Sequence, residues 1–195
     1  MTIAFVLGNG QSRQAVDLSN LAVNGTVYGC NAIYRDFEPA VLISTDTPIS
    51  TRIQEEGVSQ KLRHYTRRPL PNSGSQRIPS DWFGFSSGPV ATALACQDGH
   101  HVIYLVGFDL GALDNNRFNN VYADTEFYKK SSSRPTFTGN WIKQLCTVAK
   151  RFPRTNFIRI MGKNTADIPE FSRLGNWACL PMDRFLERVA AGKNL

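Results

Sequence analysis

The sequence predicts an α/β fold, with a Rossmann-like, mostly parallel sheet flanked by helices and a long irregular excursion at about 66–85. Short apolar runs of the kind that form buried parallel strands alternate with helical patterns along the chain. Glycine, small polar residues or an acid follow several of these runs. The 195 residues, of which 42% are hydrophobic, are enough to bury one core, so we expect a single domain over 1–195.

Three apolar runs organise the N-terminal part of the chain. Ile3–Leu7 is continuously apolar and predicts a central strand, and a short polar helix is expected near Gln14–Leu21. Thr26–Cys30 and Ala40–Ser44 predict the next two strands. A helix is expected from Pro48 to about Glu56, because proline suits the first helical turn.

The excursion at 66–85 interrupts this alternation. It holds three prolines and two glycines and is too long for an ordinary connection. A functional lid and a surface insertion are both open. Its last residues include Trp82, Phe83 and Phe85, which either stack on a base or pterin ring or pack in the core.

The alternation resumes after the excursion. A buried helix is predicted over Pro89–Cys96, followed by an apolar strand over His101–Val106 that closes on Gly107, Phe108 and Asp109. The next segment, Gly111–Gly139, is polar and shows no period.

The C-terminal part predicts one more helix–strand pair and a final helix. Apolar residues recur at helical spacing from about Asn140 to Phe152, and Asn156–Ile160 reads as a strand. A short strand over Trp177–Leu180 and a helix over Met182–Ala191 complete the chain. The aromatic residues of this part either cover the core or form a subunit contact, which leaves a homo-oligomer open.

The net charge of +6 favours phosphorylated or polyanionic partners. Much of it lies in Arg63–Arg68, at Arg77, and at Lys129, Lys130 and Arg134. Solvated loop charge explains the same pattern. No continuous basic stripe and no recognised nucleic-acid module is visible, so we expect no sequence-specific nucleic-acid binding.

Cysteine spacing and hydropathy indicate the compartment. The four cysteines are scattered without a CxxC pair, as expected of free thiols in a reducing compartment. No apolar run is long enough for a membrane span, and no basic segment precedes the first strand. We therefore expect a cytoplasmic protein with no membrane partner.

The first candidate site is the turn after the first predicted strand. Gly8, Asn9 and Gly10 add little bulk, so a phosphate or ribose can approach the backbone there. Ser12 adds a hydroxyl group, and Arg13 a charge that neutralises phosphate. The stretch lacks the third glycine of a dinucleotide-binding motif and the lysine of a P-loop. A nucleotide-binding turn and a plain tight turn are both open.

Other candidates follow the remaining strands, at the sheet edge where ligands bind in open α/β folds. Asn31 suits a base or ribose, whereas Asp46 and Asp109 suit ribose hydroxyls, proton transfer or a magnesium ion. Ser86–Gly88 is a second cradle for an anion at a helix start. Local capping is the alternative for each of them. We expect Asp46 and Asp109 to be the catalytic residues and the ligands of any magnesium ion.

Five stretches together resemble the motifs of a Rossmann-like superfamily. They are Gly8–Ser12, Gly29–Tyr34, Ser44–Asp46, Ser86–Gly88 and Gly99–Asp109. The superfamily includes the bacterial sialyltransferases of the Campylobacter lipooligosaccharide type and the archaeal 6-hydroxymethylpterin diphosphokinase-like proteins. The resemblance covers about residues 3–110, and more loosely reaches about 165. The compact length and the segment Asn119–Gly139 also resemble tailed-phage proteins of this group.

The resemblance to the sialyltransferases implies a site for a cytidine monophosphate-sugar. The implied nucleotide contacts are Asn9, Ser12, Asn31, Ser86, Ser87 and Gly88. Tyrosines that hold the departing phosphate in those enzymes would correspond to Tyr122 and Tyr128. Those enzymes also use a histidine base after the Gly-Phe-Asp-like motif, whereas no histidine follows His101 here.

Resemblance to the diphosphokinase-like proteins implies ATP and magnesium held by carboxylates, for which Asp46 and Asp109 would serve. Two hypotheses result. One is a transferase that uses a nucleotide or nucleotide-sugar as substrate, for glycosyl or diphosphoryl transfer. The alternative is a non-catalytic protein that binds or sequesters a nucleotide, and a phage source is open for either.

Overall fold

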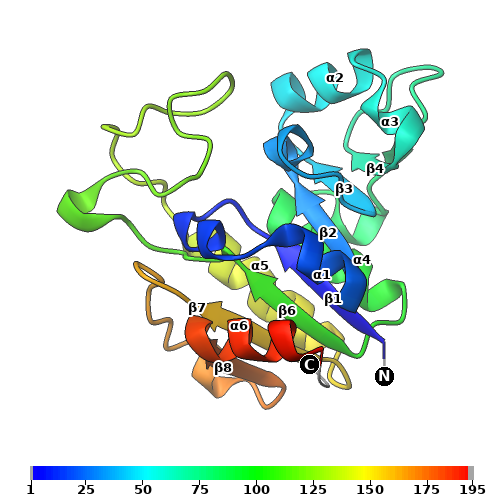
Figure 1. Cartoon of the computed structure of the whole chain (residues 1–195). Coiled ribbons are helices and arrows are strands. Elements are labelled where there is room, and N and C mark those ends of the chain that lie inside the picture. The colour runs from blue at the N-terminus through cyan, green and yellow to red at the C-terminus, as the bar shows by residue number, and fades with distance from the viewer. Residues whose placement is uncertain (1, 193–195) are drawn as a thin grey trace.

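An eight-stranded parallel sheet runs through residues 2–192, which are the residues that this computed structural model describes (Figure 1). Its strand order is β5-β4-β3-β2-β1-β6-β7-β8, and every neighbouring pair is parallel. The strands are β1 (Ile3–Leu7), β2 (Thr26–Cys30), β3 (Val41–Ser44), β4 (Arg63–Thr66), β5 (Gln76–Arg77), β6 (Val102–Val106), β7 (Asn156–Met161) and β8 (Trp177–Pro181). The predicted Rossmann-like α/β class, with helices flanking the sheet, is confirmed.

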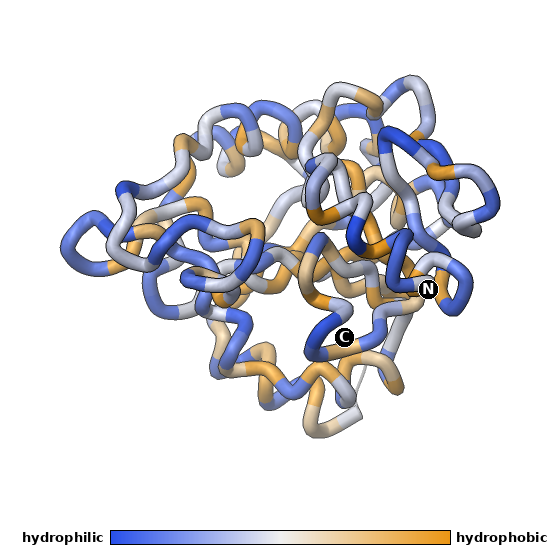
Figure 2. Tube along the Cα trace, turned by 90° about the horizontal axis from the view of Figure 1, so that it is seen from above, coloured by the Kyte–Doolittle hydropathy of each residue, from blue (hydrophilic) through white to orange (hydrophobic). Residues whose placement is uncertain are grey.

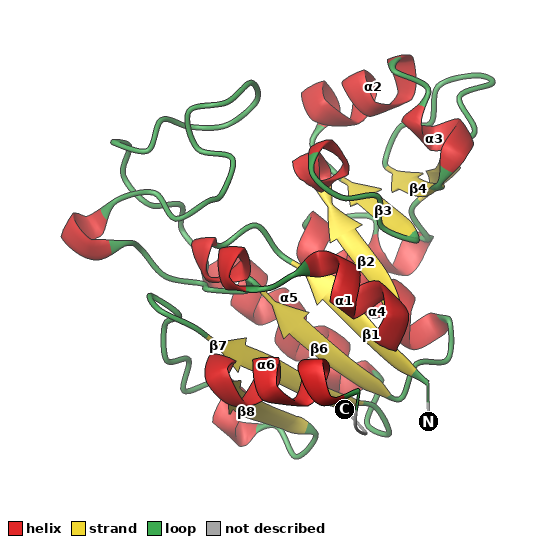
Figure 3. Cartoon of the chain, viewed as in Figure 1, coloured by secondary structure: helices red, strands yellow, loops and turns green. Residues whose placement is uncertain are grey.

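Helices cover both faces of the sheet (Figure 3). They are α1 (Leu18–Asn24), α2 (Thr47–Glu55), α3 (Val58–Lys61), α4 (Ser87–Gln97), α5 (Gly139–Arg151) and α6 (Met182–Ala191), with short 3₁₀ helices η1 (Gln11–Ala15), η2 (Asn31–Arg35), η3 (Ser80–Trp82), η4 (Asp114–Asn116) and η5 (Phe171–Arg173). None of the helices in residues 2–192 is long and apolar enough to cross a bilayer.

Strand alternation divides the core into two layers. Along β1, Ala4 and Val6 pack with α4 and α5, whereas Phe5 and Leu7 pack with α1, α2 and α6 on the other face. Figure 2 shows the hydrophobic positions gathered along the sheet and the hydrophilic ones on the projecting loops. Phe171 and Phe185 are buried in the two layers, so these C-terminal aromatic residues cover the core.

Helix α4 is buried almost all round, because it lies between the sheet and α5. Every residue from Pro89 to Cys96 is buried, which explains its uniformly apolar sequence. The helix packs against β1, β2, β3 and β6. Its N-terminus therefore lies at the carboxyl ends of these central strands.

The sequence prediction missed β4 and β5. The sequence indicates a basic run over Arg63–Arg68, either solvated or facing a phosphate, but His64, Tyr65 and Thr66 are buried in β4. Strand β5 pairs in parallel with β4 and forms the sheet edge. The chain between them is fastened to α2, where the Gln54 Oε1 atom accepts hydrogen bonds from Leu70 N (2.7 Å), Ser73 Oγ (3.0 Å) and Ser75 Oγ (2.6 Å). Much of the excursion thus extends the sheet.

The first predicted helix is also displaced. The structure has η1 and α1 where the sequence predicted one helix near Gln14–Leu21. Asp17 separates the two, because its side chain accepts a hydrogen bond from Ser19 N (2.9 Å) and caps α1.

Candidate functional site

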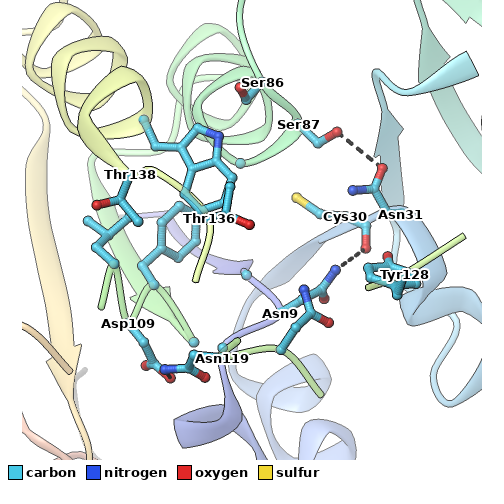
Figure 4. A pocket seen from close by; sticks show the side chains of 18 of the residues that line it. Asn9, Cys30, Asn31, Ser86, Ser87, Asp109, Asn119, Tyr128, Thr136 and Thr138 are labelled. Carbon is cyan, nitrogen blue, oxygen red and sulfur yellow. Dashed lines mark hydrogen bonds between the residues drawn. The ribbon is translucent and has the colours of Figure 1, made fainter. Parts of the chain in front are cut away.

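A pocket of about 460 Å³ lies at the carboxyl ends of β1, β2, β3 and β6 (Figure 4). The chain turns from β1 toward β2 and from β6 toward β7, so the pocket lies where the strand order reverses, the usual ligand site of such sheets. Ten sequence-predicted site residues line it: Gly8, Asn9, Gly10, Asn31, Asp46, Ser86, Ser87, Gly88, Asp109 and Tyr128. Three others, Ser12, Arg13 and Tyr122, lie behind its wall rather than in its lining.

The turn after β1 packs against the turn after β6. Gly10 N donates to Gly107 O (2.9 Å), and a Cβ atom at Gly10 would lie 2.7 Å from the same oxygen. The next N–H groups are also occupied, because Gln11 N donates to Asn119 Oδ1 (2.9 Å) and Ser12 N to Asp109 Oδ2 (3.1 Å). The glycines therefore serve close backbone approach, and the protein's own acceptors hold the first amides of η1.

Asp109 is 3% exposed and its carboxylate accepts four hydrogen bonds. The donors are Ser12 N, Ser12 Oγ, Asn119 Nδ2 (3.1 Å) and Thr165 Oγ1 (3.1 Å). The carboxylate thus joins three segments that are far apart in the sequence. Asp109 lies at one end of the pocket beside Asn119 (Figure 4).

A buried guanidinium group supports the same turn from behind. Arg159 is 1% exposed, and burial lowers its pKa. It donates to the backbone oxygens of Phe108 (2.8 Å), Asp109 (2.9 Å) and Ala166 (2.9 Å). Sequence reasoning did not single out Arg159, which reads there as an ordinary strand residue.

Arg13 and Tyr122 hold the Asn9 side chain in place. Arg13 is 5% exposed and donates to Asn9 Oδ1 (3.0 Å) and to the Tyr122 hydroxyl oxygen (3.0 Å). The Tyr122 hydroxyl donates in turn to Asp36 Oδ2 (2.6 Å). Asn9 Nδ2 donates to Cys30 O (3.2 Å), so both ends of its amide have partners within the protein.

The end of β2 presents a polar group that is less occupied. Asn31 has a left-handed backbone (φ 54°), and its Oδ1 atom accepts a hydrogen bond from Ser87 Oγ (3.2 Å). Within residues 2–192 its Nδ2 atom makes no hydrogen bond, and Figure 4 shows this nitrogen facing the cavity. Ser87 Oγ also accepts from Thr45 N (3.0 Å), which ties α4 to the end of β3.

The N-terminus of α4 opens into the pocket. The first N–H groups of a helix have no partner within it, and the helix dipole favours an anion there. Ser86 at the cap position makes no side-chain capping bond, although its own N–H donates to Gln144 Oε1 (2.9 Å). Ser87 and Gly88, the first two helical residues, line the pocket. This cradle, unlike the turn after β1, has amides to offer a ligand.

Two cationic side chains, which come from separate segments of the chain, line the pocket. Arg67 follows β4 and is braced by hydrogen bonds to Phe83 O (3.1 Å) and Phe85 O (2.9 Å). Lys129 belongs to the segment 111–138 and donates to Thr136 Oγ1 (3.4 Å).

Burial keeps two titratable groups of the lining neutral. It raises the pKa of Tyr128 to about 12 and that of Cys30 to about 12. The Tyr128 hydroxyl oxygen accepts from Ala32 N (3.3 Å), which leaves its own proton available to a ligand. The Cys30 thiol is a poor nucleophile at neutral pH, because the thiolate is the reactive form.

One wall of the pocket was predicted from the sequence only at Tyr128. Segment 111–138 contributes Phe118, Asn119, Phe127 and Thr136, and α5 contributes Trp141. Its length without a period was the available signal, because long structureless loops in compact domains are commonly functional.

Of the aromatic residues proposed to stack on a base, none of the three lines this pocket. Trp82 is 4% exposed and packs against Phe85 and Phe152, with ring centroids 5.4 and 6.1 Å apart. Core packing therefore explains Trp82.

The histidines lie elsewhere. His64 is buried in β4 between Ser44 Oγ (2.6 Å) and Ser59 Oγ (2.7 Å), and burial lowers its pKa to about 4. His100 and His101 precede β6, at the opposite edge of the sheet.

The acids available do not fit a protein-held magnesium ion. Asp46 lines the pocket, is exposed, and makes no capping bond to α2. Asp109 already has four donors on its two oxygens, which fills its acceptor capacity. No group of three or more candidate ligands occurs among the described residues.

This chain shows only limited similarity to known proteins. No protein family and no curated protein matches the sequence. One solved structure with a similar chain course is the Campylobacter jejuni sialyltransferase CstII with the substrate analogue cytidine-5'-monophosphate. It is 16% identical with a TM-score of 0.47, over 90% of this chain and 84% of that one. Another is the sialyltransferase CST-II with a trisaccharide acceptor and CMP, 14% identical with a TM-score of 0.47, over 81% and 80%. Function is therefore argued from the pocket itself.

Proposed function

We propose that the pocket binds a nucleotide or nucleotide-sugar and that the protein is a transferase acting on it, by glycosyl or diphosphoryl transfer. One observation carries this proposal. At the point where the strand order reverses, the N-terminus of α4, Arg67 and Lys129 line one pocket, and the Asn31 Nδ2 atom faces it without a hydrogen-bond partner among residues 2–192. Its volume of about 460 Å³ is in the range of small-molecule sites. The motif resemblance supports the same ligand class.

The phosphate is assigned to the α4 end of the pocket. Backbone N–H groups of Ser87 and Gly88 point there, and Arg67 supplies a full positive charge. Tyr128 donates its hydroxyl proton to a phosphate oxygen, since its raised pKa keeps it protonated at neutral pH. The departing phosphate of a transfer reaction would develop its charge against these donors.

The nucleoside is assigned to the polar floor and the aromatic wall. Asn31 Nδ2 is free to donate to a base or ribose oxygen, and Asn9 is fixed beside it by Arg13. Trp141 and Phe118 offer flat faces for a base.

Asp46 is assigned the role of general base, the group that accepts a proton from the attacking hydroxyl. It is the lining carboxylate without a hydrogen-bond partner among residues 2–192, whereas Asp109 is held by four donors. In a glycosyl transfer, Asp46 would take the proton of an acceptor hydroxyl as the new C–O bond forms. The bond to the nucleotide phosphate then breaks, and its electron pair leaves on the phosphate oxygen.

A binding-only function is the second candidate. The described residues place no histidine in the pocket, and one of its two acids is committed to the scaffold. A sequestering protein needs the phosphate cradle and Asn31 but not Asp46.

Thermal unfolding with a panel of nucleotides and nucleotide-sugars tests binding. A ligand at 100 times its Kd stabilises by about 2.7 kcal/mol, which raises Tm by about 5–11 °C for a chain of this size. Asn31→Asp should weaken binding at least about tenfold, because it puts a negative charge beside the ligand. Asn20→Asp, at an exposed position of α1 that does not line the pocket, is the matched control.

Consumption of each nucleotide then separates the two candidates. A transferase predicts turnover that falls about 10²- to 10⁴-fold in Asp46→Asn. Stabilisation without any consumption would favour the binding-only function. If no nucleotide stabilises the protein, both are wrong.

A further inference from the structure

Two stretches of the segments that contribute to the pocket carry cations and no carboxylates. Residues 66–78 contain Arg67, Arg68 and Arg77, residues 127–138 contain Lys129, Lys130 and Arg134, and neither range holds Asp or Glu. Within the described chain, none of these six side chains has a carboxylate oxygen within 4.0 Å. Arg67 and Lys129 line the pocket itself, whereas Leu70, Ser73 and Ser75 of the first stretch are bound to α2 through Gln54. Each stretch thus places one cation in the pocket lining.

Exposed aromatic rings belong to the same two stretches or contact them. Among residues 2–192 the large exposed aromatic side chains are Phe83, Phe127 and Phe137, with 40%, 39% and 77% of their surface exposed. Phe127 lines the pocket, and Phe137 stands between Thr136 and Thr138, which also line it. Phe83 accepts the hydrogen bond from Arg67 through its backbone oxygen. The exposed phenylalanines thus accompany the cations, and exposed apolar groups of this kind are typical of interaction surfaces.

We define the rim as residues 66–78, Phe83 and residues 127–138, which together carry the six cations and the three exposed rings. Within it the Arg77 guanidinium lies 5.9 Å from the Phe83 ring centroid. Cations beside exposed rings complement a polymer in which flat apolar groups alternate with negative charges.

We propose that the rim binds single-stranded nucleic acid, with phosphates on the unpaired cations and bases stacked on the exposed phenylalanines. Phenylalanine rings have no hydrogen-bonding group, so they favour the π-face of a base over the hydroxyl edges of an acidic glycan. The two rim segments contain no α-helix, which argues against an amphipathic anchor for a membrane surface. Base stacking and phosphate contacts do not distinguish one nucleotide sequence from another. Such binding is consistent with a chain in whose sequence we recognise no nucleic-acid recognition module.

This inference extends the proposed function, on which its catalytic part rests: a strand on the rim would present a nucleotide over the pocket mouth as the acceptor of the transferred group. The binding itself requires no turnover. The two claims can therefore fail separately.

Fluorescence anisotropy of labelled (dT)20 and U20 tests the binding. Each phosphate neutralised on a single strand contributes about −0.7 to the slope of log K against log salt. Six contacts give a slope near −4, so affinity should fall on the order of 10²-fold between 50 and 200 mM salt. Lys130→Ala/Arg134→Ala should reduce the slope by about 1.4 while nucleotide stabilisation stays unchanged, because neither residue lines the pocket.

Phe137→Ala should weaken oligonucleotide binding by about 5- to 150-fold, the range found for one base–aromatic stack. Arg154→Ala and Val23→Ala, both exposed at the opposite edge, are the matched controls and should leave binding unchanged. Asn31→Asp should weaken nucleotide binding at least about tenfold and leave oligonucleotide binding intact.

Three results would overturn the inference. They are no oligonucleotide binding at 50 mM salt, a Phe137→Ala variant that binds as well as the parent, and binding of heparin or phosphatidylserine vesicles that is as strong and as sensitive to Phe137→Ala. Oligonucleotide binding without any nucleotide binding would support the rim and refute the proposed function.

Discussion

Asp109→Asn is the sharpest test of how the pocket is built. The change keeps the size of the side chain and removes its charge. One oxygen becomes an NH₂ group, which cannot accept a hydrogen bond. Ser12 N must keep an acceptor, so the remaining oxygen should take the Oδ2 position, and the NH₂ group should face the Ser12 and Thr165 hydroxyls. Those hydroxyls can rotate and accept.

The expected cost follows from the four hydrogen bonds. A hydrogen bond to a charged group contributes about 1.5–3 kcal/mol to the free energy of unfolding, and one between neutral groups about 0.5–1.5 kcal/mol. Each of the four bonds should therefore weaken by up to about 1 kcal/mol. Losing the charge also removes one of the negative groups that favour the charged form of buried Arg159, which adds to the cost. We expect a loss of about 2–4 kcal/mol in unfolding free energy, or about 4–16 °C in Tm.

Urea denaturation at pH 7 measures this loss, and Asp46→Asn is its matched control. Both acids follow a parallel strand, but Asp46 is exposed and makes no capping bond, so its substitution should change stability by less than about 0.5 kcal/mol. Turnover, where present, should fall in Asp46→Asn without loss of fold. An Asp109→Asn protein as stable as the parent would refute the assignment of Asp109 to the scaffold.

Two further predictions concern stability, one at the turn after β1 and one in β4. Gly10→Ala should destabilise by more than about 2 kcal/mol, because its Cβ atom would lie 2.7 Å from Gly107 O; Gly84→Ala, with open space around it, should be neutral in the same unfolding assay. His64 is buried with its pKa lowered to about 4, below its unfolded value near 6.5, so its contribution to stability is present above pH 6.5 and is lost as pH falls toward 4. Stability should drop by about 2–3 kcal/mol between pH 7 and 4.5, and His64→Gln should flatten that drop; an unchanged profile would contradict the burial argument.

The fold was predictable where strands are apolar throughout. Ile3–Leu7 and Thr26–Cys30 were predicted with the bounds that the structure has, because continuous burial in a parallel sheet leaves a clear pattern. Strand β4 was missed because its buried polar residues, such as His64 and Thr66, are satisfied by serines that come from other elements. A single sequence shows the polar residues but not their partners.

The location of the pocket could be predicted from the sequence better than the role of each residue in it. Strand-end residues such as Asn9, Asn31 and Asp46 were expected at one edge, and they line one pocket. Ser12 and Arg13 follow the same turn, but η1 directs them behind the wall, toward Asp109 and Tyr122. The rotation of a short 3₁₀ helix decides which side chains face a ligand, and composition does not encode it.

The two strand-end acids differ because their strands have different neighbours. Asp109 follows β6, whose turn packs directly against the glycine turn of β1, so backbone amides and hydroxyls from both sides close on its carboxylate. Asp46 follows β3, where the adjoining strand β2 leads into η2 and leaves the space above open toward α4. A carboxylate enclosed by donors has little left to offer a substrate, whereas one at an open edge keeps its lone pairs. The position of each acid within the sheet thus gives Asp109 a structural role and leaves Asp46 free to react. Activity should therefore depend on Asp46 and stability on Asp109.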